Sequence, residues 1–354
     1  MITVHKPNIY TTSNYVEYNF LIDIDGKQQS VYIQVDKLLK DNVSTLSDAA
    51  LVTMLLPAMV ENHELKVNGT VSEKLVNNIT ELQKLIVKVI PWCNIINVTF
   101  ENIELEKEIE KELVVAGFSA GVDAFVTLQE YYLEPIHNDQ LTHVLFNNLI
   151  YNETIAEDKF NHIKKLTDKI KLPLVKTNTN FHNLYAKKKI GFEQTHPIRN
   201  AVIAHLLSAK GIKLLYSSSF PLKDFEIKPW PDIAIVNKIL LPLLSTDKTK
   251  IVDVGSEYTR VQKTKIISKI DYSYDFLDIC IGKKHLKSDY YNCSQCYKCM
   301  RALVTFEKLG VLEKYNKLFD MSLYQKNKIK YLKKVYNSTQ LNDVDLVRFL
   351  NGEQ

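Results

Sequence analysis

Glycine and proline are scarce in this chain of 354 residues, which has ten of each, and cysteine occurs only five times. So little glycine and proline excludes collagen-like and low-complexity proteins, and a composition of 45% apolar and 24% charged residues excludes a disordered one. The length exceeds the usual size of a single hydrophobic core. We therefore expect a folded globular protein with two or three structural units.

The chain also lacks a strong excess of positive or negative charge, because its formal net charge is only +4 at pH 7. Nucleic-acid binding would need a local cluster of cations, and one lies between Lys314 and Lys334, where seven lysines accompany a single acidic residue. A solvated amphipathic helix explains this cluster more simply than a nucleic-acid surface does. We therefore predict a basic helical tail and do not expect nucleic acid as a partner.

Long apolar runs are absent too. The longest, ALVTMLLPAMV, is too short to span a bilayer. The first residues, MITVHKPNIYTTSN, lack the apolar core behind a basic start that marks a signal peptide. These absences predict a cytoplasmic protein without membrane contact, whose thiols stay reduced.

The first 110 residues predict a small α+β domain. Two strand-like runs meet at Asp25-Gly26, a hairpin signal, and two helical patterns and a closing strand follow. Ser47 is the expected N-cap of the first helix. Apolar content then drops in the glutamate-rich ENIELEKEIEKE, so we place a domain boundary near residue 110.

Strands and helices alternate from about residue 111 to residue 275. Four continuous apolar runs have the length of strands, and helical patterns separate them: ELVVAGF, THVLFNNL, PLVKTNTNF and IKLLYSSSF. This pattern predicts an α/β fold with a parallel sheet covered by helices on both faces. Such sheets bind ligands at the carboxyl ends of their strands.

The segment from Phe118 to Asp123, FSAGVD, joins the first of these strands to the first helix. Successive backbone N–H groups and the positive end of the following helix favour an anion there, and Ser119 adds a hydroxyl donor. A tight turn that merely needs small residues fits this stretch equally well. The residues alone leave both interpretations open.

Residues 119–124, SAGVDA, resemble the SGGxDS loop of PP-loop ATP pyrophosphatases, which follows the first strand of an adenine-nucleotide alpha-hydrolase (HUP-like) fold. The resemblance implies that ATP binds here with Mg²⁺. Two positions differ. Ala120 replaces a glycine, at a cost of roughly 1–2 kcal/mol if that position needs a positive φ, and Ala124 replaces a serine whose hydroxyl would donate to phosphate.

Four of the five cysteines fall within twenty residues, in CIGKKHLKSDYYNCSQCYKC, and they are Cys280, Cys293, Cys296 and Cys299. Four thiolates at this spacing match tetrahedral Zn²⁺ with no open position, so we predict a structural zinc site. An iron–sulfur cluster is the alternative, but the usual downstream cysteine followed by proline is missing. The spacing also permits His285 to replace one of the cysteines as a zinc ligand.

This cysteine arrangement also resembles the C-terminal zinc site of the cyano-deazaguanine synthase-like branch of the PP-loop superfamily. The two motifs together cover about residues 112–310. The complete prediction has four segments: a small α+β domain at 1–110, a nucleotide-binding domain at 111–275, a zinc-binding helical segment at 276–310 and a basic helical tail at 311–354.

Arg260 and Lys263 follow Gly255 at helical spacing and lie one turn apart on one face. Such a pair suits the negative charge that develops on departing pyrophosphate, and we predict a catalytic role for both and for Asp123. A surface helix with paired charges is the alternative. The apolar run before Ser245 is strand-like, so Asp247 is expected just after the end of a strand. The predicted ATP-binding residues are the loop and four polar residues near strand ends: Phe118, Ser119, Ala120, Gly121, Val122, Asp123, Asn147, Ser217, Ser218 and Asp247.

These features predict an ATP-dependent enzyme that adenylates a carboxylate or amide oxygen, releases pyrophosphate and then transfers nitrogen or ligates. The substrate would be a small-molecule or peptide carboxylate. Two alternatives stay open: a catalytically degenerate nucleotide-binding module that acts through a protein partner at residues 1–110, and a tRNA-modifying relative. Proteins with parallel sheets of this kind frequently form dimers, so a homodimer is one of the assemblies we expect.

Overall fold

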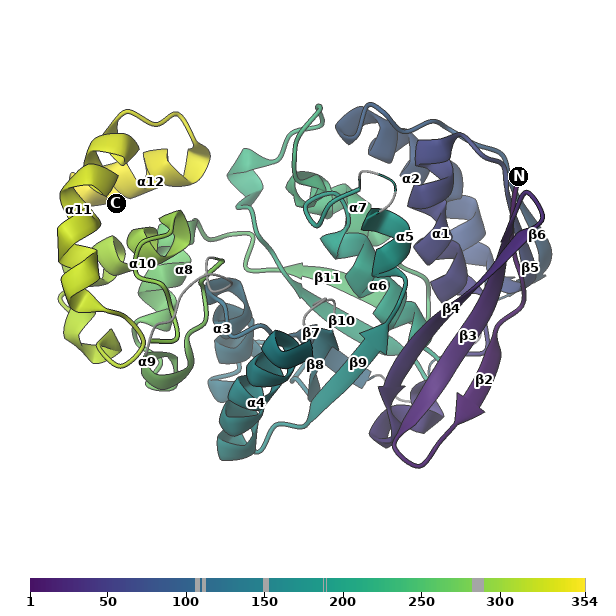
Figure 1. Cartoon of the computed structure of the whole chain (residues 1–354), viewed down its shortest axis with the longest axis horizontal. Helices are drawn as coiled ribbons and strands as arrows, with labels where there is room; N and C mark the ends of the chain where they lie inside the picture. The colour runs from purple at the N-terminus through teal and green to yellow at the C-terminus, as the bar shows by residue number, and fades with distance from the viewer. Residues whose placement is uncertain are drawn as a thin grey trace.

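The computed structural model describes residues 1–105, 109, 113–148, 153–186, 188, 190–281 and 290–353. Its strands form one eleven-stranded sheet in the order β11-β10-β7-β8-β9-β4-β3-β1-β5-β6, and β2 pairs with β3 (Figure 1). The predicted α/β class is therefore confirmed. Within these ranges no helix combines the length and the apolar character that a membrane crossing requires.

The N-terminal part of the sheet is mixed. Its strands are β1 (Ile2–Val4), β2 (Asn8–Thr11), β3 (Tyr15–Ile24), β4 (Lys27–Asp36), β5 (Leu65–Ser72) and β6 (Val98–Glu104), and its helices are α1 (Asp48–Glu61) and α2 (Glu73–Val89). The predicted hairpin joins β3 to β4, where Asp25 and Gly26 both have positive φ, 52° and 84°. Such turns match the twist of the flanking strands. Ser47 precedes α1 as expected, but its hydroxyl donates to the carbonyl of Asn68 instead of capping the helix.

The other part of the sheet is parallel. It contains β7 (Leu113–Gly117), β8 (His143–Asn148), β9 (Leu174–Thr179), β10 (Ile212–Ser217) and β11 (Thr249–Val254). The helices between and after them are α3 (Val122–Leu128), α4 (Glu153–Ile170), α5 (His182–Ala186), α6 (His196–Leu206), α7 (Asn237–Leu243) and α8 (Arg260–Ile267). A π-helical turn at Gln129–Leu133 continues α3 without a break.

One element of this part was predicted wrongly. The apolar run before Ser245 forms α7, and the strand β11 comes after it. A short apolar run fits a buried helix as well as a strand, so its periodicity could not separate the two.

Helices cover both faces of the parallel strands, as predicted. Successive strand residues point to opposite faces, so Val115 joins a core that also holds residues of α1, α2, α6 and α7, whereas Val114 and Ala116 join a second core with residues of α3, α4 and α8. The sheet therefore lies between two hydrophobic layers. This burial on both faces explains why the parallel strands have continuous apolar sequences.

The sheet does not stop at the predicted boundary near residue 110. β4 pairs with β9 in antiparallel register, with Ile33 opposite Thr179, and the first core contains residues from both parts of the sheet. Residues 110–112 themselves lie outside the described ranges. The first 110 residues thus extend the parallel sheet.

The C-terminal segment packs against the α3–α8 side, at the end of the molecule opposite the N-terminal strands (Figure 1). It contains α9 (Ser273–Phe276), α10 (Tyr297–Lys308), α11 (Met321–Tyr336) and α12 (Leu341–Leu350). The segment predicted as a basic helical tail, 311–354, contains both α11 and α12. Short 3₁₀ turns complete the fold at Lys37–Asn42, Leu222–Asp224, Ile233–Val236 and Leu312–Tyr315.

Candidate functional site

The strand order reverses between β7 and β10. From β7 the chain adds β8 and β9 on one side, and it then crosses to add β10 and β11 on the other. The helices that follow β7 and β10 therefore lie on opposite faces of the sheet, and in open parallel sheets ligands bind at such a point. The loop at residues 118–121 follows β7, while Ser217 ends β10 and Ser218 follows it, so the structure brings both predicted segments to this point.

The loop after β7 is held by three hydrogen bonds of its backbone groups. The amide of Phe118 donates to the carbonyl of Leu145 (2.9 Å), and the amide of Gly121 donates to Oγ of Ser119 (3.3 Å). The carbonyl of Ala120 accepts from the amide of Asp278 (2.8 Å). Ala120 has φ 57°, the left-handed conformation for which glycine is normally used. The cost anticipated for alanine at this position therefore applies.

Several amides of this loop remain available. Those of Ser119, Ala120, Val122, Asp123 and Ala124 donate no hydrogen bond to any residue within the described ranges. They lie at the start of a helical segment that continues from α3 through the π-helical turn. Unpaired amides at a helix start favour an anion. Phe118 is different, because its amide is already bonded and its ring packs edge-on against Phe125.

Asp123 forms the centre of a charged cluster beside this loop. Its Oδ2 lies 2.8 Å from Nη1 of Arg260, and its Oδ1 lies 3.0 Å from Nζ of Lys263. Burial alone would raise the pKa of Asp123, but the attraction of the two cations outweighs burial and lowers it. Asp123 is therefore an ionised carboxylate that orders both cations.

Lys263 is only 2% exposed, although it is a lysine. Its ammonium also donates to the carbonyl of Ser218 (2.5 Å), so two acceptors compensate for its burial. A Cβ on Gly255, which has φ 73°, would lie 3.5 Å from Cε of Lys263. Such a distance is an ordinary contact, so it is the positive φ of the turn before α8 that favours glycine at this position.

The predicted pairing of Arg260 and Lys263 on one face of a helix is confirmed. Thr259 and Gln262 form a capping box that begins α8 at Arg260, which aims both cations at α3. The surface-helix alternative fits Arg260 and Lys263 poorly, because their side chains are only 19% and 2% exposed. With one carboxylate between two cations, the cluster has a net charge of +1.

The polar residues at the other strand ends are already bonded. Nδ2 of Asn147 donates to Oδ1 of Asn200 (2.9 Å), while the hydroxyl of Ser217 contacts Oγ1 of Thr127 (2.7 Å). The hydroxyl of Ser218 donates to the carbonyl of Phe220 (2.8 Å). Of the predicted hydroxyls, that of Ser119 lies in an exposed residue and donates to no group in the part of the chain that the structure describes.

Asp247 does not belong to this site. It precedes β11, so it lies near the amino ends of the parallel strands, where it pairs with Lys74 of α2 (3.0 Å). The prediction placed it after a strand because the preceding apolar run was assigned as a strand. Since that run forms a helix, Asp247 is at the opposite edge of the sheet.

The four cysteines come together, as their spacing predicts. The candidate ligand sulfurs of Cys280, Cys293, Cys296 and Cys299 all lie within 4.8 Å of one another. The sulfur of Cys299 is 3.8 Å from that of Cys293 and 3.4 Å from that of Cys296. Tetrahedral zinc with bonds of about 2.3 Å would separate its sulfurs by roughly 3.8 Å, so the cluster fits such an ion. His285 lies outside the described residues.

The cysteine cluster is a neighbour of the loop. Asp278, which bonds to Ala120, is two residues before Cys280, and its carboxylate pairs with Lys159 (2.7 Å). The side chain of Asn292 fixes this segment, because it accepts from the amide of Ile279 and donates to the carbonyl of Leu277. Sequence spacing did not reveal the roles of Asp278 and Asn292, since their partners are distant along the chain or are backbone atoms.

A second polar network lies on the α6 side of the sheet. Nε2 of His196 is 2.9 Å from Oδ1 of Asp232, and its Nδ1 contacts the hydroxyl of Tyr216. His196 and Tyr216 are 7% and 6% exposed. The sequence singles out no partner for His196, because Tyr216 and Asp232 are 20 and 36 residues away.

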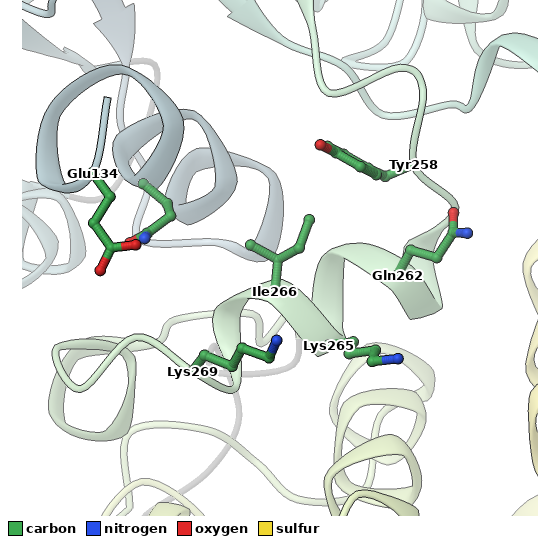
Figure 2. Close-up of a pocket in the computed structure, with 7 residues that line it drawn as sticks. Glu134, Tyr258, Gln262, Lys265, Ile266 and Lys269 are labelled. Atoms are coloured by element: carbon green, nitrogen blue, oxygen red, sulfur yellow. The ribbon is translucent and has the colours of Figure 1, made fainter. Parts of the chain in front are cut away.

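A cavity of about 550 Å³ lies away from the loop, between α8 and the residues that flank the π-helical turn (Figure 2). Its lining residues are Gln129, Glu134, Tyr258, Gln262, Lys265, Ile266 and Lys269. None of them belongs to the loop or to the Asp123 cluster.

Comparison with known proteins adds no assignment to this geometry. Neither a protein family, nor a curated protein, nor a solved structure matches the chain.

Proposed function

We propose that this protein is an ATP-dependent enzyme of the PP-loop kind, which adenylates an oxygen of its substrate and releases pyrophosphate. The observation that carries the proposal is the set of amides at Ser119, Ala120 and residues 122–124, which donate to no described residue and are located where the strand order reverses. The resemblance of SAGVDA to the pyrophosphate loop agrees with this position.

In this proposal the loop amides and the hydroxyl of Ser119 bind the β- and γ-phosphates of ATP, with Mg²⁺ offsetting their charge. A carboxylate or amide oxygen of the substrate attacks the α-phosphorus, and the bond to pyrophosphate breaks. Arg260 is the cation that reaches the phosphates, because Lys263 is buried behind Asp123. A nitrogen nucleophile then displaces AMP from the adenylate.

We assign the four-cysteine cluster to structural zinc. All four ligands would come from the protein, so the ion would have no open position for substrate. Through Asp278 the zinc segment would hold the carbonyl of Ala120 and with it the loop conformation.

The test measures nucleotide products by mass spectrometry after incubation with ATP, Mg²⁺, ammonium and a panel of carboxylates. We expect AMP and pyrophosphate in equal amounts. Arg260→Gln should lower their formation at least tenfold. Lys326→Gln, an exposed position on α11 outside this cluster, should leave it unchanged. Release of ADP and phosphate, or equal losses in both variants, would contradict the proposal.

A second candidate is a nucleotide-binding module without turnover. It is favoured by Ala124, which has no hydroxyl to donate, and by the pairing of both cations with Asp123. For such a module we expect ATP binding without AMP formation in the same assay. Restoration of turnover by the double variant Ala120→Gly with Ala124→Ser would favour the enzyme. An affinity for tRNA that falls steeply with salt concentration would instead favour the tRNA-modifying alternative.

A further inference from the structure

The cavity beside α8 is separate from the loop and is built on the opposite side of the same helix. Arg260 and Lys263 point to Asp123, whereas Gln262, Lys265 and Ile266 line the cavity. Figure 2 shows Ile266 in the middle of this space, with Glu134 on one side and Tyr258 and Gln262 on the other. Its volume of about 550 Å³ is in the range of small-molecule sites.

The cavity offers an apolar floor and an aromatic wall. Ile266 and Tyr258 are both half-buried and pack against the second hydrophobic core. Tyr258 also lies near the carboxyl group of Glu130, which is only 5% exposed. Packing against the core restricts the tyrosine ring, so this wall is formed before any ligand arrives.

The charges around the cavity are unequal. Within the described ranges, Lys265 and Lys269 make no ion pair, although both side chains are exposed at the rim. Glu134 is the single carboxylate in the lining, and it lies across from them. A ligand with one negative end would therefore direct that end toward the lysines and away from Glu134.

We propose that this cavity is a binding site for a small organic anion with a flat apolar body, such as an aromatic carboxylate. The apolar body would lie on Ile266 and against Tyr258, and the carboxylate would pair with Lys265 and Lys269. The side-chain amides of Gln129 and Gln262 would supply further donors. The site is distinct from the ATP loop and does not depend on the function proposed for it.

The experiment uses 2-naphthoate as the probe and the full chain without nucleotide. Calorimetric titration should show one saturable site per chain. The double variant Lys265→Glu with Lys269→Glu should weaken it at least tenfold. A control with the same charge change, Lys326→Glu with Lys330→Glu on α11, should bind like the unmodified protein, since both of its lysines are exposed and lie outside the cavity.

A neutral analogue, 2-naphthalenemethanol, separates charge from apolar contact. We expect it to bind at least tenfold more weakly than 2-naphthoate, and we expect the difference to shrink at 0.5 M salt. Equal weakening in the control variant, equal affinity for the neutral analogue or the absence of saturable binding would each overturn the proposal. Thermal unfolding of each variant verifies that it is folded.

Discussion

The backbone amide of Asp278 donates a hydrogen bond of 2.8 Å to the carbonyl of Ala120. This bond joins the segment that leads to Cys280 to the residue with the left-handed conformation in the loop. The cysteine cluster and the loop are more than 150 residues apart in sequence, yet one bond couples their backbones. Changes at the cysteines should therefore be detected at the loop.

The first prediction concerns metal removal. Cys299→Ser should abolish stoichiometric zinc and lower the melting temperature, because one of four ligands is lost. Hydrogen exchange in peptides that span 113–125 should accelerate. Cys93→Ser is the control, since both cysteines are buried but Cys93 is outside the cluster. The prediction fails if the loop exchanges at the same rate with and without metal.

The second prediction concerns the buried charge pair. Asp123→Asn removes the negative charge beside the ammonium of Lys263, which is 2% exposed and keeps only neutral acceptors such as the carbonyl of Ser218. An uncompensated buried charge costs on the order of 3 kcal/mol in the free energy of unfolding. Urea denaturation measures this loss. Adding Lys263→Met to Asp123→Asn should recover about half of the lost free energy of unfolding, because the buried charge is removed. If the double variant lost as much free energy as the two single variants together, Asp123 and Lys263 would not be coupled.

The third prediction is a pH dependence. Burial raises the pKa of Asp123, but the two cations lower it more strongly. In the folded protein this pKa therefore lies below the ordinary value of 3.8. The pair therefore contributes fully above pH 3.8, and its contribution is lost as the pH falls through the folded pKa. The difference in melting temperature between the unmodified protein and Asp123→Asn should be constant from pH 7 to pH 5 and should shrink below pH 4. A difference that grows in acid would refute this.

The fourth prediction compares two alanines that are close in the chain but differ in backbone conformation. Ala120 has φ 57°, whereas Ala124 is inside α3. Ala120→Gly relieves roughly 1 kcal/mol of backbone strain and should leave the free energy of unfolding within about 0.5 kcal/mol. Ala124→Gly should cost about 1 kcal/mol, since glycine is unfavourable in a helix. Equal losses in chemical denaturation would mean that the loop conformation is not strained.

Local patterns sufficed for several parts of this protein. The hairpin at Asp25-Gly26, the strand-to-helix loop at 118–121 and the one-turn spacing of Arg260 and Lys263 depend on residues near one another in the chain. The cysteine cluster was also predictable, because three of its members share a short C-x2-C-x2-C segment. Backbone preference and side-chain periodicity act at this range, so the sequence carries them directly.

Long-range contacts decided the rest. The pairing of β4 with β9, the salt bridges from α8 to Asp123 and the bond from Asp278 to Ala120 all join segments that are distant in sequence. The placement of Asp247 at the far edge depended on whether one apolar run became a helix, and only packing against neighbouring elements settles that choice. Amino-acid order thus determined the pieces and the chemical groups they carry, while burial of two apolar layers around a single sheet determined which groups meet.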